Sequence, residues 1–213
     1  MSDPTDAKDL VRAGYDEISE AYRGDTFELE GSAYERGIAA IERRLPTGAR
    51  VLDLGCGCGV PVAERLAGRF AVTGVDLSER QVQRARDLVP SATFVRADMT
   101  EVDLPAAGFD AIVSFYAIIH VPLGEQPALF DRIAAWLAPG GVFCGSLGHR
   151  AWTGTEEDWH GAPMYWSHAD RATYASWLTD RGFRIDQEWF IPEGNGGHAA
   201  FLATLLTGVV ARG

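Results

Sequence analysis

The segment Val51–Gly59 (VLDLGCGCG) joins a short apolar run to a cluster of glycines. Glycines between a strand and a helix let the backbone adopt positive φ and approach a ligand closely. The dinucleotide-binding fingerprint G-x-G-x-x-G would need its third glycine where this chain has Val60. Asp53, just before the glycines, would repel a pyrophosphate but suits a cationic or amine-bearing ligand. The segment therefore predicts a ligand-binding loop that differs from a dinucleotide site.

Two further acids stand where the next two apolar runs end. Asp76 closes the run that begins at Thr73, and Asp98 follows the run that ends at Arg96. The carboxyl ends of parallel strands share one edge of a sheet, so we expect the three carboxylates to line one crevice there. An acid at the position of Asp76 can accept hydrogen bonds from both hydroxyls of a ribose.

The elements that must position these residues alternate between strands and helices. Short apolar, β-branched runs predict strands, and the amphipathic stretches between them predict helices. Such alternation is typical of a parallel sheet covered by helices on both faces. The last two strands have so short a link that we expect them to be antiparallel. The predicted strands are residues 50–54, 70–75, 92–96, 109–114, 142–147, 183–190 and 198–207, and the helices between them are residues 60–67, 78–89, 126–137 and 169–181.

Two regions depart from this alternation. Residues 6–23 and 31–45 have helical periodicity, so residues 1–46 are expected to form an N-terminal helical cap. Residues 148–168 show no clean period and are rich in Trp, Tyr, His and Gly, which predicts an insert. The length of 213 residues predicts a single domain, residues 1–213.

The composition limits the partners. The chain has 19 basic and 30 acidic side chains, a formal net charge of −11 and no basic run, so we expect no nucleic-acid partner. It has no apolar leader segment and no apolar stretch of membrane-spanning length, so we expect a cytoplasmic protein with no membrane partner. Cys56 and Cys58 have no second pair of ligands with zinc-site spacing, so we expect no metal.

Five segments, in order, resemble the motifs of class I S-adenosylmethionine-dependent methyltransferases, over roughly residues 10–206. The resemblance implies a Rossmann-like, doubly wound α/β fold with a mostly parallel seven-stranded sheet, an antiparallel C-terminal strand pair and an N-terminal helical cap. It implies transfer of a methyl group from S-adenosyl-L-methionine to an O, N or C atom of a small molecule, such as a natural-product intermediate, with S-adenosyl-L-homocysteine as product. The segments are VLDLGCGCG (51–59), GVDLSERQ (74–81), RADM (96–99), FDAIVSFYAIIHVP (109–122) and LAPGGVF (137–143).

The resemblance also implies roles for matched positions. The glycine loop would wrap the methionine part and the adenosine, and Asp76 would bind the ribose hydroxyls. Asp98 would accept from the adenine amine, and Met99 would cover the ring. Tyr15 resembles an N-terminal tyrosine that caps the carboxylate end of the cofactor in many relatives. The implied cofactor-binding residues are Tyr15, Asp53, Gly55, Cys56, Gly57, Gly59, Asp76, Leu77, Gln81, Asp98, Met99, Ser114 and Phe115.

Aromatic residues predict where the methyl acceptor binds. In this family the region of the insert often builds the acceptor pocket or a lid. An aromatic-walled cavity suits a planar or cationic molecule. Alternatively, the insert packs its own aromatic side chains against the sheet, and for Trp159 and Trp166 both interpretations stay open. The predicted substrate-binding residues are Tyr22, Tyr116, Trp159, Tyr165 and Trp166.

Methylation of an alcohol, phenol, ammonium or activated carbon releases a proton, and histidine is the natural base near neutral pH. We hypothesise that His120, after the fourth predicted strand, or His168, at the end of the insert, deprotonates the acceptor. Alternatively, His120 packs against the cofactor and His168 caps the next helix. Methyl transfer would then depend on positioning alone.

Two other classes of function remain open. A regulatory or repurposed protein on the same scaffold would keep the loop and the acids but transfer no methyl group. A dinucleotide oxidoreductase is disfavoured by Asp53 and Val60. Cofactor binding and turnover would separate the three classes.

Overall fold

The computed structural model describes residues 4–207, whose centre is a seven-stranded sheet. The strand order is β3-β2-β1-β4-β5-β9-β8, with parallel pairing from β3 to β5 and antiparallel pairing of β9 with both neighbours. The predicted α/β class, the parallel sheet and the antiparallel C-terminal pair are confirmed. The strands are β1 (Arg50–Leu54), β2 (Ala71–Asp76), β3 (Thr93–Arg96), β4 (Phe109–Ser114), β5 (Leu137–Gly148), β8 (Phe183–Glu193) and β9 (Gly196–Leu205).

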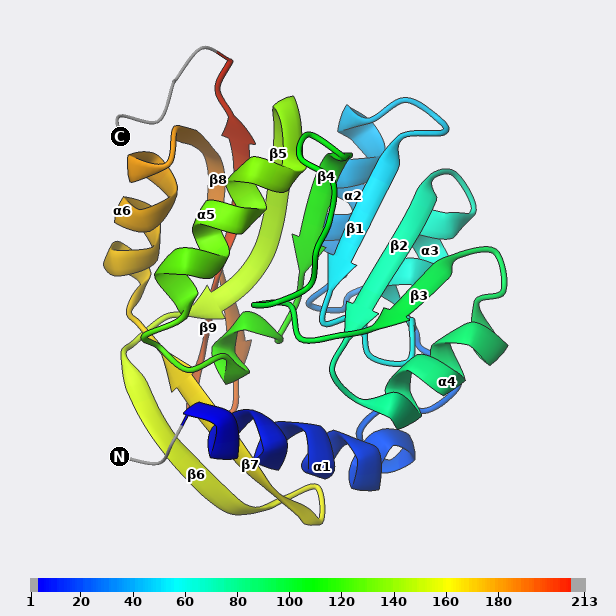
Figure 1. The fold of residues 1–213 in the computed structure, drawn as a ribbon, viewed down its shortest axis with the longest axis vertical. Helices are drawn as coiled ribbons and strands as arrows, with labels where there is room; N and C mark the ends of the chain where they lie inside the picture. Colours follow the sequence, from blue (N-terminus) through cyan, green and yellow to red (C-terminus); the bar gives the residue numbers. More distant parts are fainter. Residues whose placement is uncertain (1–3, 208–213) are drawn as a thin grey trace.

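Helices cover both faces of the sheet, as Figure 1 shows. Alternate residues of a strand face opposite sides, so Val51 of β1 packs with one set of helices, whereas Leu52 and Leu54 pack with the other. Both faces are buried, as expected for the parallel part of a sheet. The first set is α2 (Glu35–Arg44), α3 (Val62–Ala67) and α4 (Glu79–Leu88), and the second is α5 (Gln126–Trp136) and α6 (Arg171–Asp180).

Helix α1 (Pro4–Tyr22) lies across the edge at which β1 and β2 end (Figure 1). Its apolar face packs against the insert, where Val11 and Ile18 join Ala162 and Met164 in a small buried cluster. The N-terminal helix therefore covers the edge at which the sequence predicts a ligand crevice. Residues 1–3 of the predicted cap and 208–213 of the predicted domain lie outside the described residues.

The insert is a β-hairpin of β6 (Trp152–Trp159) and β7 (Ala162–His168). The sequence shows no alternation of apolar and polar residues here, because most of β6 is exposed on both faces. In addition, a register shift interrupts the pairing between Glu156 and Trp159. His160 and Gly161 form the turn, both with positive φ (55° and 104°), which fits the type I′ geometry of two-residue hairpins. A residue–glycine pair between two aromatic stretches was the signal that could have revealed it.

Other differences concern the ends of elements. Helix α2 begins at Glu35 rather than at residue 31. Strand β5 begins at Leu137 rather than at residue 142, and its pairing with β4 is irregular over these first residues. Asp170 caps α6 by accepting from the Thr173 amide at 2.8 Å, whereas His168 lies within β7. The N-cap alternative for His168 is therefore wrong. Among the helices of residues 4–207, none is both long and apolar enough to cross a bilayer.

Candidate functional site

Three adjoining cavities lie between α1, the insert and the carboxyl ends of the parallel strands. The strand-end cleft, about 720 Å³ including its open mouth, is lined by Asp76, Asp98 and neighbouring residues. The glycine-loop pocket, about 390 Å³, is lined by Asp53 and residues 55–58. The aromatic cavity, about 830 Å³, lies between α1, the insert and the hairpin of β8 and β9. Tyr22 lines all three, which places it where they meet.

Asp76 is held rigidly at the strand-end cleft. One carboxylate oxygen accepts from the Gly57 amide at 2.8 Å, and the other accepts from the Ser78 amide at 2.9 Å. Burial raises the pKa of Asp76, and these amides act against that rise. Because both bonds come from backbone groups, the carboxylate keeps a fixed orientation and retains lone pairs for hydroxyl groups of a ligand.

Asp53 is buried in β1, 2% exposed, and lines the glycine-loop pocket. Its Oδ2 atom has no hydrogen-bond partner among the described residues. Burial, with a smaller contribution from the charge of Asp76, raises the pKa of Asp53 to about 8. An unpartnered buried carboxyl is costly, so the pocket fits a ligand that brings a hydrogen-bond donor, above all an ammonium group.

The glycines of the loop have different structural roles. Gly55 has φ +74°, and a Cβ there would lie 2.0 Å from Cβ of Ala117, so no larger residue fits. Gly57 has φ +53° and no atom within 4 Å of its Cβ position, so its open side faces free space. Gly59 and Ser114 line none of the cavities: the Gly59 amide closes a turn onto the Cys56 carbonyl, and Ser114 donates to the Leu54 carbonyl below the loop.

Arg23 is a site residue that the sequence analysis missed. It lines both the glycine-loop pocket and the aromatic cavity. Its guanidinium lies 4.3 Å from the centre of the Phe27 ring and donates to the Tyr34 hydroxyl at 2.8 Å. No carboxylate of the described residues lies within ion-pair distance of it, so the charge is available to an anionic group of a ligand. Its position at the end of a predicted amphipathic helix gave no signal of this role.

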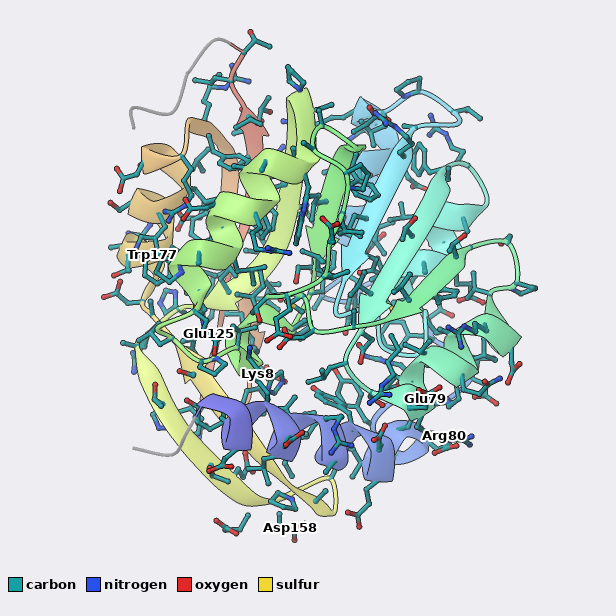
Figure 2. All side chains as sticks on the ribbon, in the orientation of Figure 1. Lys8, Glu79, Arg80, Glu125, Asp158 and Trp177 are labelled. Carbon is teal, nitrogen blue, oxygen red and sulfur yellow. The ribbon has the colours of Figure 1, made fainter. Side chains whose placement is uncertain are left out.

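Lys8, the chain's only lysine, was also missed. It lines the strand-end cleft from α1, and its ammonium lies 2.8 Å from Asp98 and 2.5 Å from Glu125. It also donates to the Thr100 hydroxyl at 2.8 Å. Figure 2 shows Lys8 close to Glu125, just before α5. Asp98 thus anchors α1 in addition to its predicted role towards adenine, and its pKa is lowered by Lys8 and Thr100 against the opposing effect of burial.

We expect Lys8→Met to lower the free energy of unfolding by about 1–2 kcal/mol, because Asp98 and Glu125 would face each other without the cation. Chemical denaturation measures the loss. Arg80→Met is the control, since Arg80 and Glu20 also join α4 to α1 but are about half exposed, at 49% and 54%. The control should cost clearly less, because exposed ion pairs add little to stability. Equal losses in both variants would contradict a special role for Lys8.

His120, which is buried, and Tyr15, which is partly buried, form a pair between the strand-end cleft and the aromatic cavity. The Nδ1 atom of His120 lies 2.7 Å from the Tyr165 carbonyl, which only accepts, so Nδ1 carries the proton. Nε2 then accepts from the Tyr15 hydroxyl at 3.0 Å. Burial lowers the pKa of His120 to about 4, so the neutral ring, with both nitrogens engaged, predominates at neutral pH.

This pair predicts how stability depends on pH. The folded pKa of His120 lies below its usual value of 6.5, so the unfolded chain binds the proton first as the pH falls. The stabilisation from His120 is present above pH 6.5 and is lost between pH 6.5 and about 4. In His120→Gln this part of the loss, about 1–3 kcal/mol, should disappear, as measured by denaturation at pH 4.5 and 7. Identical pH slopes in both proteins would contradict the assignment.

The aromatic cavity brings together most of the predicted substrate-binding residues. The ring of Trp166 packs at a tilt against that of His120, with ring centres 4.3 Å apart, and the ring centres of Trp159 and Tyr22 are 5.1 Å apart. Tyr165 does not line the cavity and contributes its carbonyl to His120 instead. His168 lines none of the three cavities. The cavity residues that the sequence analysis missed include Arg23, Tyr34, His160, Glu193 and His198.

The predicted cofactor residues divide between the cavities. Of the thirteen predicted cofactor-binding residues, eleven line a cavity. The other two, Gly59 and Ser114, hydrogen-bond to the backbone of residues 54–56 instead. The strand-end cleft takes Tyr15, Gly55, Gly57, Asp76, Leu77, Gln81, Asp98, Met99 and Phe115, and the glycine-loop pocket adds Asp53 and Cys56.

Comparison with known proteins identifies the kind of domain. Residues 51–141 match a family described as "Methyltransferase domain". Over 149 residues the chain is 30% identical to the sterol 24-C-methyltransferase of Yarrowia lipolytica, a match that covers 66% of this chain and 37% of that protein. The chain thus spans about a third of the length of the curated sterol methyltransferases it matches.

Two solved structures extend the similarity over the fold. An S-adenosylmethionine-dependent methyltransferase from Mesorhizobium loti is 25% identical, with a TM-score of 0.65, over 83% of this chain and 100% of that one. The 1,6-didemethyltoxoflavin-N1-methyltransferase of Burkholderia thailandensis is 21% identical, with a TM-score of 0.71, over 97% and 92% of the two chains. Residues 51–141 of this chain thus match a methyltransferase domain, and its fold is that of S-adenosylmethionine-dependent methyltransferases.

Proposed function

We propose that this protein transfers a methyl group from S-adenosyl-L-methionine to a small molecule bound in the aromatic cavity. One observation carries the proposal: the strand-end cleft and the glycine-loop pocket adjoin the aromatic cavity at Tyr22, which lines all three. Tyr15, Tyr116 and His120 form the rest of the boundary between the cleft and the cavity. A cofactor in the first two spaces would present its reactive centre to the third.

The residues present fit this cofactor. The unpartnered Asp53 carboxyl suits the ammonium of its amino-acid part, whose charge would favour the ionised form of Asp53, and the Arg23 guanidinium suits the carboxylate. Asp76 offers two fixed oxygens to the ribose hydroxyls. The open side of Gly57 leaves room for the ligand against the loop.

The cofactor supplies an electrophilic methyl group, and the protein has to hold the acceptor in line with it and exclude water. Tyr15, fixed by His120, and Tyr22 form the wall at which this alignment is set. That His120 or His168 acts as the base stays a prediction. The geometry favours positioning for His120, whose nitrogens are both engaged, and gives His168 no access to the cavities.

The acceptor is a small, planar molecule rather than a nucleic acid. The aromatic cavity, about 830 Å³ with its mouth, is of the size of small-molecule sites, and its aromatic walls stack well on planar rings. The net charge of −11 opposes binding of polyanions. The structural relative from Burkholderia thailandensis has a small bound acceptor, 1,6-didemethyltoxoflavin, which agrees with this size class.

Isothermal titration with S-adenosyl-L-methionine and S-adenosyl-L-homocysteine tests the proposal, with NADH as a comparison ligand. We expect micromolar binding of the first two, and we expect Asp76→Asn to raise the Kd at least about tenfold by weakening charge-assisted hydrogen bonds. Asp87→Asn, on the exposed side of α4, is the matched control and should leave the Kd unchanged.

The other outcomes separate the alternatives. Binding of NADH alone would overturn the proposal in favour of an oxidoreductase. Binding of both sulfur ligands without turnover on any planar acceptor would support a regulatory or repurposed protein.

A further inference from the structure

A buried arginine outside the cavities holds the segment at which they meet. Arg84, in α4, is 6% exposed and lines none of the three cavities. One guanidinium nitrogen donates to the Ser19 carbonyl at 2.7 Å and to the Ser19 hydroxyl at 2.9 Å. The other donates to the Arg23 carbonyl at 2.8 Å and to a carboxylate oxygen of Asp25 at 2.7 Å. All four contacts are therefore with residues 19–25.

These contacts fix the C-terminal end of α1, which ends at Tyr22 and lies beside α4 in Figure 1. Helix ends leave carbonyls without regular partners, and the planar fork of an arginine can bind two main-chain oxygens in a fixed geometry. Because two of the four contacts go to main-chain carbonyls, they set the course of the backbone rather than the rotamer of one side chain. Residues 22 and 23 lie within the fixed segment.

The fixed segment carries the charged site residue Arg23. Its guanidinium carbon lies 4.3 Å from the centre of the Phe27 ring, 5.3 Å from that of Tyr22 and 5.4 Å from that of Tyr34. All three rings line the aromatic cavity, so the charged end of Arg23 is at the cavity wall. Two of them, Tyr22 and Tyr34, also line the glycine-loop pocket, which would take the cofactor's amino-acid part. A displaced backbone at Arg23 would therefore move this charge relative to the pocket.

A second contact ties the same segment to the cofactor site. The Ser19 hydroxyl donates to Oε1 of Gln81 at 2.9 Å, and both residues are buried. Gln81 lies three residues before Arg84 on the same face of α4 and lines the strand-end cleft and the glycine-loop pocket. Ser19 thus links Arg84 to a residue that lines both spaces.

We propose that Arg84 is a positioning residue for the cofactor. By fixing residues 19–25 it holds the Arg23 guanidinium where it meets the carboxylate of the cofactor's amino-acid part, so that the site selects nucleoside thioethers that carry this part. Arg84 also pairs with Asp25, so this acid, two residues beyond Arg23, does not neutralise the Arg23 charge. The inference rests on the proposed function and names the residue that controls recognition of the amino-acid part.

The test compares two ligands by isothermal titration. S-adenosyl-L-homocysteine has both the nucleoside and the amino-acid part, whereas 5′-methylthioadenosine is the nucleoside thioether without that part. We expect the wild type to bind S-adenosyl-L-homocysteine at least about 100-fold more tightly. Arg84→Met should reduce this preference about tenfold, by raising the Kd of S-adenosyl-L-homocysteine and leaving that of 5′-methylthioadenosine nearly unchanged. A purely structural role would not separate the two ligands.

Further variants show whether Arg84 acts through Arg23. Arg23→Met should reduce the preference at least as much as Arg84→Met. The double variant should lose no more than Arg23→Met alone, because both substitutions remove the same interaction with the ligand. Arg84→Lys keeps the charge but lacks the fork, so it should lose about threefold, and it tests the inference even if Arg84→Met does not fold.

Arg86→Met is the matched control. Arg86 also lies in α4, but its guanidinium donates to the Phe94 carbonyl at 3.1 Å rather than to the end of α1. This substitution should leave the Kd of both ligands unchanged.

The contrary results fall into two groups. A wild type that binds both ligands equally well, an unchanged preference in the folded Arg84 variants, or an additive loss in the double variant would overturn the inference while leaving cofactor binding in place. Failure of the wild type to bind S-adenosyl-L-homocysteine would overturn the proposed function, and the inference with it.

Discussion

Asp53→Asn should stabilise the free protein while weakening its binding of S-adenosyl-L-methionine. In the free protein the Asp53 carboxyl is buried without a donor, and its pKa is raised from 3.8 to about 8. At pH 7 the folded chain therefore holds a proton that the unfolded chain has released, a cost of at most about 4 kcal/mol. An amide needs no such proton, so we expect the free energy of unfolding to rise by about 1–3 kcal/mol.

The same substitution removes the carboxylate that we propose as the partner of the cofactor's ammonium group. The Kd of S-adenosyl-L-homocysteine should rise about 100-fold, because a charge-assisted bond is lost in a buried pocket. Asp110→Asn is the control: Asp110 lies in β4, pairs with Arg50 and is outside the cavities, so its loss should not change the Kd. A destabilised Asp53→Asn protein with unchanged affinity would contradict both parts.

The pH dependence gives a second check on Asp53. Its folded pKa lies above the unfolded value, so the folded state binds more protons between pH 4 and 8, and the free energy of unfolding falls as the pH rises through that window. The advantage of Asp53→Asn over the wild type should grow over the same window. The sign is opposite to that of His120, whose contribution to stability increases with pH.

Gly55→Ala should be severely destabilising. The new Cβ would lie 2.0 Å from Cβ of Ala117, and the residue would keep φ near +74°. Overpacking and the left-handed backbone together should cost about 2–5 kcal/mol, measured by denaturation, and distort the loop enough to abolish detectable cofactor binding.

Two other glycines separate the effects of strain and space. Gly57→Ala meets no atom within 4 Å, so it should cost only about 1 kcal/mol of stability, yet its methyl group points into free space next to the loop and should block the cofactor. Gly48 has φ +84°, close to that of Gly55, but lies in a distant turn. Gly48→Ala should therefore leave cofactor binding unchanged. A Gly55→Ala protein as stable as Gly48→Ala would contradict the close contact with Ala117.

Strong local signals explain why the sheet could be predicted. Residues 50–54 and 109–114 form strands with the predicted bounds because both are short apolar runs with clear ends. Ser78 caps α4, accepting from the Gln81 amide at 3.0 Å. The insert was not predicted as a hairpin because the period of a strand depends on one buried face, and β6 has almost none.

The site was predictable only where residues stand beside a motif. Asp76 and the glycines are fixed by the loop itself, so their places follow from the strand–loop–helix pattern. Lys8 of α1, Arg23 just after α1, and Glu193 and His198 of the last hairpin are far from the motif in the sequence. Their roles depend on tertiary packing, on which local periodicity carries no information.

The ion-pair network around Lys8 has a practical consequence. As the chain's only lysine, it is the one side chain that a lysine-directed reagent can acylate. Its ammonium is a poor nucleophile while Asp98, Glu125 and Thr100 hold it, so labelling requires α1 to lift from the cleft. The acylation rate of one peptide, followed by mass spectrometry, would therefore report the opening of the strand-end cleft in the unmodified sequence.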